Sequence, residues 1–108
     1  MKNDSTIWES PQAEQLLTAF LSIDNAGLMK AFLRDIMTEK EILELSNRLK
    51  AAQMLLESEK YTDIAQTTGL SSRTIARIKD WINQGNGGYK TVIGNLEAHH
   101  GHMPPARD

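Results

Sequence analysis

The stretch YTDIAQTTGLSSRTIARI at residues 61–78 constrains the fold of this chain more than any other segment. Its apolar positions recur at helical spacing on either side of Gly69, which indicates two short helices that meet at a corner. A helix-turn-helix unit needs a small residue where its helices touch and a glycine in its turn, and Ala65 and Gly69 supply both. The sequence therefore predicts a helix-turn-helix over about residues 61–83. Its shared core is predicted to contain Ile64, Leu70, Ile75 and Ile78.

The second helix of this unit has an outer face that suits DNA. Spacing residues at about 100° per step puts Ser72, Arg73, Ala76 and Arg77 on the side away from the apolar residues. Arginine can make a bidentate contact to guanine, alanine can touch a thymine methyl group, and serine can bind a base edge or a phosphate. Because the start of a recognition helix enters the major groove, Ser72, Arg73 and Ala76 are predicted to read bases. Arg77 and Lys79 lie further along and are predicted to contact phosphates.

The distribution of charge favours a polyanionic partner for this segment, although the whole chain has a formal net charge of −2. Residues 60–90 carry five basic and two acidic side chains, a local net charge of +3, whereas residues 1–59 carry six basic and ten acidic ones. The electric field of the charges around a binding surface matters more for binding than the net charge of the whole chain. Because the chain as a whole is acidic, a ligand other than DNA is also possible. The alternative to DNA binding is a helix-turn-helix module that binds protein or RNA.

The residues before this unit predict two amphipathic helices. Ser10 and Pro11 suit the start of the first helix, because serine caps a helix and proline is tolerated at its first position. A second helix is expected from about Ala26. Both carry apolar residues at the i, i+3, i+4, i+7 spacing of one buried face. These residues are Ala13, Leu16, Leu17, Phe20 and Leu21 in the first helix, and Leu28, Met29, Phe32, Leu33, Ile36 and Met37 in the second.

Two further helices complete the expected fold. Thr38 and Glu41 have the spacing of a capping box, in which each side chain accepts a hydrogen bond from the other residue's backbone N–H. The longest helix should begin there and continue to about Ser58. A glycine-rich segment at residues 85–88 should interrupt the chain before a last helix at residues 89–98. No segment alternates like a strand, so the fold class is all-α with about six helices.

Length and composition predict a single domain over residues 1–98, with a flexible tail over residues 99–108. No apolar run approaches the roughly 20 residues that a membrane-spanning helix needs, and residues 1–10 lack a signal-peptide pattern. A cytoplasmic protein without a membrane partner is expected. The absence of cysteine agrees with a reducing compartment.

Enzymatic and metal-binding functions find little support in the sequence. There is no nucleophile elbow, phosphate-binding loop or dinucleotide-binding fingerprint, so no catalytic residue is predicted. His99, His100 and His102 could bind zinc, nickel or copper. The glycine and prolines around them favour a solvated terminus instead, so no metal site is predicted.

The chain resembles the Trp repressor family, and within it the uncharacterised Trp-repressor-like helix-turn-helix regulators. The resemblance covers about residues 16–96. It rests on four segments: MTEKEI at 37–42, NRLKAAQMLLE at 47–57, TIARI at 74–78 and NQGNGGYKTVI at 83–93. It implies an interlocked homodimer with two projecting helix-turn-helix units. The implied function is that of a sequence-specific regulator of transcription, a repressor, which reads a palindromic double-stranded DNA operator.

The resemblance also implies a ligand site that this sequence alters. The best-known members bind L-tryptophan between two arginines, with a threonine that helps to hold it, and Thr38, Arg48 and Arg77 match these positions. Ile78 replaces a glycine of the tryptophan binders and Trp81 replaces a serine. Because protein interiors are close-packed, both side chains are expected to fill the pocket, so neither tryptophan co-repression nor another cofactor is expected. Alternatively, Thr38 is only a helix cap, Arg48 pairs with a carboxylate and Trp81 belongs to the core.

Overall fold

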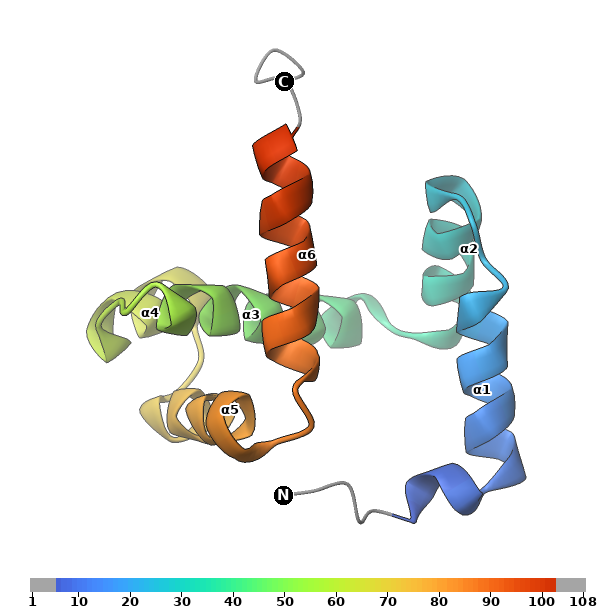
Figure 1. The fold of residues 1–108 in the computed structure, drawn as a ribbon, viewed down its shortest axis with the longest axis horizontal. Coiled ribbons are helices and arrows are strands. Elements are labelled where there is room, and N and C mark those ends of the chain that lie inside the picture. Colours follow the sequence, from blue (N-terminus) through green and yellow to red (C-terminus); the bar gives the residue numbers. More distant parts are fainter. Residues whose placement is uncertain (1–5, 103–108) are drawn as a thin grey trace. The chain divides into compact units, whose positions relative to one another are not determined.

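The computed structural model describes residues 6–102, and within this range it contains helices and turns but no strand (Figure 1). The elements in chain order are a short 3-10 helix η1 (Ile7–Glu9), α1 (Pro11–Leu21), α2 (Ala26–Ile36), α3 (Glu39–Leu56), α4 (Tyr61–Thr68), α5 (Ser72–Gln84) and α6 (Gly88–His102). The prediction of an all-α fold with six α-helices is confirmed. The three residues of η1 are too few to show a period, so the sequence did not predict that turn.

The chain divides into two compact units, and the boundary between Ser46 and Asn47 falls inside α3. Residues 6–46 contain η1, α1, α2 and the first part of α3. Residues 47–102 contain the rest of α3 and the helices α4, α5 and α6. The expectation of a single domain over residues 1–98 stays a prediction.

The helices of residues 6–46 begin where the sequence predicts. The Ser10 hydroxyl accepts a hydrogen bond from the Ala13 N–H at 3.2 Å, which caps α1. The capping box before α3 is present, with 2.9 Å from the Thr38 N–H to the Glu41 carboxylate and 3.1 Å from the Glu41 N–H to the Thr38 hydroxyl. Despite these caps, α1 and α2 contain no buried residue. Local signals therefore define these helices, while their apolar faces stay accessible within the chain.

Residues 47–102 have a tight apolar core that supports the helix-turn-helix. Every secondary-structure element of this unit contributes to it. Its buried members are Ala51, Ala52 and Met54 from α3, Ile64 from α4, Ile75, Ile78 and Ile82 from α5, and Ile93 from α6. Leu49, Leu55, Tyr61, Ala65, Leu70 and Tyr89 pack against it at partly buried positions. The predicted core residues of the helix-turn-helix thus lie in or against one cluster.

The end of α3 is closed by a left-handed residue that is not a glycine. Ser58 has a φ of +63°. The Ser58 N–H donates to the Leu55 carbonyl at 3.0 Å, and the Glu59 N–H donates to the Met54 carbonyl at 2.9 Å. These two bonds form a Schellman motif, in which glycine is the usual left-handed residue. Serine carries a Cβ there and so adopts a less favourable backbone conformation.

The last helix is longer than the sequence indicates. It begins at Gly88 and ends at His102, whereas the prediction ended it at Ala98. Residues 99–102 thus have a helical backbone, while the flexibility expected of residues 99–108 stays a prediction. Proline stops a helix most strongly, and the first proline after Gly88 is Pro104, beyond the end of α6. Residues 103–108 lie outside the described part of the chain.

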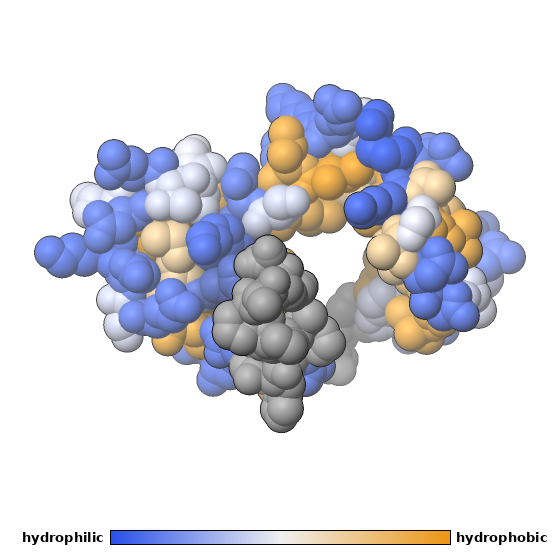
Figure 2. Space-filling model, turned by 90° about the horizontal axis from the view of Figure 1, so that it is seen from above, coloured by the Kyte–Doolittle hydropathy of each residue, from blue (hydrophilic) through white to orange (hydrophobic). Residues whose placement is uncertain are grey.

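Among residues 6–102, none of the helices combines the length and the hydrophobicity that a membrane span requires. Apolar side chains nevertheless lie on the surface of both units, where Figure 2 shows them as orange areas. Their largest members are Ile7, Trp8, Leu16, Leu17, Leu21, Leu28, Ile36, Leu43, Leu45, Leu56, Trp81, Val92 and Leu96. Where such side chains adjoin one another, they are typical of a surface that docks against another molecule.

Candidate nucleic-acid interface

Gly69 forms the corner between α4 and α5. Its φ of +77° lies in the left-handed region, and its N–H donates to the Ala65 carbonyl at 2.8 Å. A Cβ built on Gly69 would meet nothing within 4 Å. The requirement for glycine therefore comes from the backbone conformation and not from a lack of space, because side chains rarely adopt this region. The predicted role of Gly69 is confirmed.

Thr68 also holds the corner, and sequence reasoning missed it. Its side chain is buried, and its hydroxyl donates to the Ile64 carbonyl at 2.8 Å. The same hydroxyl accepts from the Leu70 N–H at 3.2 Å. One side chain thus satisfies a carbonyl of α4 and an N–H of the turn. The available signal was a threonine directly before the turn glycine, since threonine side chains readily bond nearby backbone groups.

Ser71 sets the start of the second helix. Its hydroxyl oxygen accepts a hydrogen bond from the Thr74 N–H at 3.1 Å, which makes Ser71 the N-cap. By residue type alone, either Ser71 or Ser72 could cap this helix. Because Ser71 takes this role, Ser72 becomes the first residue of α5, and its exposed side chain is available to another molecule.

The buried face of α5 fixes which residues point outward. Ile75 and Ile78 have no exposed surface, and Ile82 is also buried. The predicted DNA-contacting residues are all exposed on the same helix: Ser72, Arg73, Ala76, Arg77 and Lys79. Within the described residues, none of the three cations among them makes an ion pair. The structure therefore presents three charged groups and two small side chains from a helix anchored by isoleucines.

The residues that match a tryptophan site differ from one another in their surroundings. Thr38 uses its hydroxyl in the capping box of α3. Arg48 is partly buried and makes no ion pair among the described residues, so the alternative in which it pairs with a carboxylate is wrong there. Arg77 is exposed on α5. Ile78 is fully buried, as its bulk in place of a glycine predicts.

Trp81 corrects the sequence-based expectation. The alternative that it belongs to the core is wrong, because 42% of it is exposed, while the expectation that it fills a ligand pocket stays a prediction. On a helix, Trp81 lies about a quarter turn from the centre of the face made by Ile75, Ile78 and Ile82, at roughly 100° per residue. The isoleucines occupy the core, so the indole lies at its edge.

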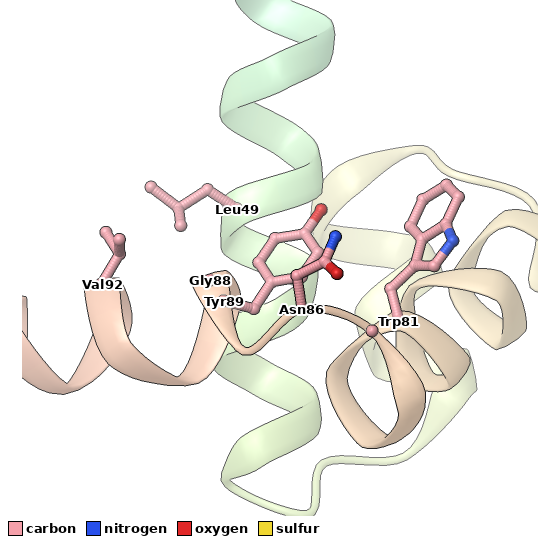
Figure 3. A pocket seen from close by; sticks show the side chains of 7 residues that line it. Leu49, Trp81, Asn86, Gly88, Tyr89 and Val92 are labelled. Carbon is pink, nitrogen blue, oxygen red and sulfur yellow. The ribbon is translucent and has the colours of Figure 1, made fainter. Parts of the chain in front are cut away.

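The indole forms one wall of a pocket of about 550 Å³ within residues 47–102 (Figure 3). The pocket is lined by Leu49, Trp81, Gly85, Asn86, Gly88, Tyr89 and Val92. Burial raises the pKa of the Tyr89 hydroxyl, while the positive charge of Arg48 acts in the opposite direction. Sequence reasoning missed this pocket, because it treated the glycine-rich segment only as a helix breaker. The described residues contain no cluster of acidic, histidine or cysteine side chains that could hold a metal ion.

Comparisons with known proteins agree with this geometry. The family model of the Trp repressor protein matches residues 11–97. The uncharacterised protein YerC of Bacillus subtilis is 34% identical over 86 residues, which cover 80% of this chain and 83% of that protein. The crystal structure of a TrpR-like protein from Eubacterium eligens has a TM-score of 0.81 at 39% sequence identity, and the match covers 86% of this chain and 96% of that one. The helix-turn-helix, the long capped helix and these matches lead to one conclusion: the chain belongs to the Trp repressor family, a family of regulators.

Proposed function

We propose that this protein is a sequence-specific double-stranded DNA-binding regulator of transcription, and that it acts as a repressor in the cytoplasm. The observation that carries the proposal is the outer face of α5, where two small side chains and three cations, which make no ion pair within residues 6–102, project from a helix fixed by buried isoleucines. A fixed helix suits base reading, because its backbone needs no further ordering on binding.

The two ends of this face serve different contacts. Ser72, Arg73 and Ala76 lie in the first turns of α5, which is the part of a recognition helix that reaches base edges. Arg77 and Lys79 lie later and bind phosphates, which position the helix without reading sequence. Their charge also attracts DNA from a distance.

The exposed apolar faces support a homodimer. No residue of α1 or α2 is buried, and Leu21 and Leu28 are more than half exposed. A second copy of the chain would cover these faces and would place two copies of α5 about a two-fold axis. Two such helices read a palindrome with half-sites roughly 34 Å apart. The operator is therefore a palindrome.

Repression by this protein does not depend on tryptophan. Ile78 is fully buried where the tryptophan binders have glycine, so its side chain takes up space beneath α5. Trp81 offers an indole in place of a serine hydroxyl. Ile78, packed in the core, holds α5 in the orientation that tryptophan-dependent members reach with their ligand. DNA binding that begins only after tryptophan is added would contradict this.

The decisive experiment is selection of bound duplexes from random DNA, followed by titration at several salt concentrations. A palindromic consensus is expected, with an affinity that falls steeply as salt rises, because neutralised phosphates release counterions. A weak dependence on salt, or enrichment of no DNA, would favour the alternative of a module that binds protein. Equal binding of single-stranded RNA would favour RNA.

Replacing Arg73 by alanine tests base reading at one position. The variant is expected to lose about 1–3 kcal/mol of binding free energy on the consensus, and to relax the preference at one base pair in each half-site. Arg34→Ala is the matched control, since it removes the same charge from an exposed position of α2. An equal loss on every DNA sequence would make Arg73 a phosphate contact.

A further inference from the structure

The connection between α5 and α6 contains the sequence Asn86-Gly87. The Gly87 carbonyl accepts from the Thr91 N–H at 3.1 Å, but the groups on either side of the Asn86-Gly87 peptide bond are less restrained. The Asn86 side chain is exposed, and Gly87 has a φ of +86°. Within the described residues, neither Asn86 nor the backbone N–H of Gly87 makes a hydrogen bond. A Cβ built on Gly87 would meet nothing within 4 Å, so the space on that side of the residue is open. No hydrogen bond therefore keeps the side-chain amide of Asn86 apart from the backbone nitrogen of Gly87.

We propose that Asn86 is a site of spontaneous deamidation. The backbone nitrogen of Gly87 loses its proton and attacks Cγ of Asn86, a new C–N bond closes a succinimide ring, and the side-chain nitrogen takes up a proton and leaves as ammonia. Water then opens the ring at either carbonyl, which gives an aspartyl or an isoaspartyl residue at position 86. Glycine favours the attack, because it has no side chain to hinder the nitrogen and adopts more backbone conformations than any other residue.

The other asparagines of residues 6–102 provide internal controls. Asn25 is restrained, because its side chain accepts from the Leu28 N–H at 2.8 Å as the cap of α2. Asn47, Asn83 and Asn95 lie inside helices, where the following N–H is held in the regular hydrogen-bond ladder. None of these four is followed by glycine. Asn86 alone among the described asparagines is followed by a glycine, and the N–H of that glycine makes no hydrogen bond within the described residues.

The reaction changes the pocket beside it. Asn86 lines the same pocket as Trp81 and Tyr89 (Figure 3), so the product places a carboxylate at a largely apolar wall. The isoaspartyl product also adds a methylene group to the main chain between α5 and α6. The outer face of α5 is not altered, so the site is separate from the residues proposed to bind DNA.

The test is incubation of the purified full-length chain at mildly alkaline pH, with peptide mapping by mass spectrometry at intervals. The peptide with Asn86 is expected to show the mass change of an amide converted to an acid, before any peptide with Asn25, Asn47, Asn83 or Asn95 does. Its rate should rise with pH, because the attacking nitrogen must lose a proton. Fragment spectra should contain the isoaspartyl form beside the aspartyl form.

Asn86→Gln is the matched variant, because it keeps the amide but disfavours the five-membered ring. It is expected to abolish the early mass change while the other asparagines keep their rates. Retention of the Asn86 amide while another asparagine reacts would overturn the proposal. So would a product that is aspartyl alone, since direct hydrolysis then explains it. None of these measurements depends on binding to DNA.

Discussion

The two units of this chain differ in how many apolar side chains they bury. Residues 47–98 bury eight apolar side chains in one cluster, four of them isoleucines with at most 1% exposure. Residues 6–46 have well-formed helix caps and an edge-to-face contact between Phe20 and Phe32, with ring centroids 5.5 Å apart, but no buried residue. The comparison teaches that the helix-turn-helix can be assembled within one chain, whereas α1 and α2 have helical form without a complete core. A second chain is the partner that we propose for them.

Truncation in the core of residues 47–102 should have the largest effect. Ile75→Ala removes a side chain with no exposed surface and leaves a cavity, so the free energy of unfolding should fall by about 2–5 kcal/mol. Urea unfolding followed by circular dichroism would measure it. Thr74→Ala, one residue earlier and only partly buried, is the control and should cost much less. Equal losses would show that the isoleucine cluster does not anchor α5.

A charge on the apolar face of α1 tests whether a second chain covers the face that residues 6–46 leave exposed. Leu21 is 76% exposed in the single chain, so Leu21→Glu should change little within one chain. If a second copy covers this leucine, the variant should weaken the dimer by at least the roughly 1.5–3 kcal/mol that burial of a leucine supplies. Sedimentation at several concentrations would detect the shift toward monomer. Gln15→Glu adds the same charge to another exposed position of α1, and should leave the dimer intact.

The smallest predicted effect concerns the end of α3. Ser58 has a φ of +63°, so Ser58→Gly should relieve the strained conformation and stabilise the chain by up to about 1 kcal/mol. Thermal unfolding would measure the gain. Ser22, at the end of α1, has a φ of −80°, and Ser22→Gly should instead destabilise slightly by adding freedom to the unfolded chain. A gain in both variants would mean that backbone strain is not the cause.

The sequence predicted those features that local chemistry determines. Gly69 is required by a left-handed turn, Thr38 and Glu41 bond each other's backbone, and the buried face of α5 follows from helical spacing. Each signal lies within a few residues, so one sequence is enough to read it. The comparison with known proteins confirms the family that these signals indicated.

Features that depend on competition between side chains were not predictable in the same way. Trp81 was expected to be buried because it is large and apolar, but three isoleucines already fill the core beneath α5. The pocket beside Trp81 needs the placement of α3, α5 and α6 together, which no local pattern gives. The DNA contacts and the pocket residues matched to tryptophan binders remain predictions.

Ala51 and Ala52, which have no exposed surface, limit how this protein can change over evolutionary time. Any larger side chain at these positions would overpack the cluster beneath the helix-turn-helix, and overpacking costs stability. The outward positions of α5 carry no such restriction, because their side chains meet solvent. Descendants of one ancestor can therefore exchange the residues at 72, 73 and 76 freely and acquire new operators while they inherit an unchanged interior.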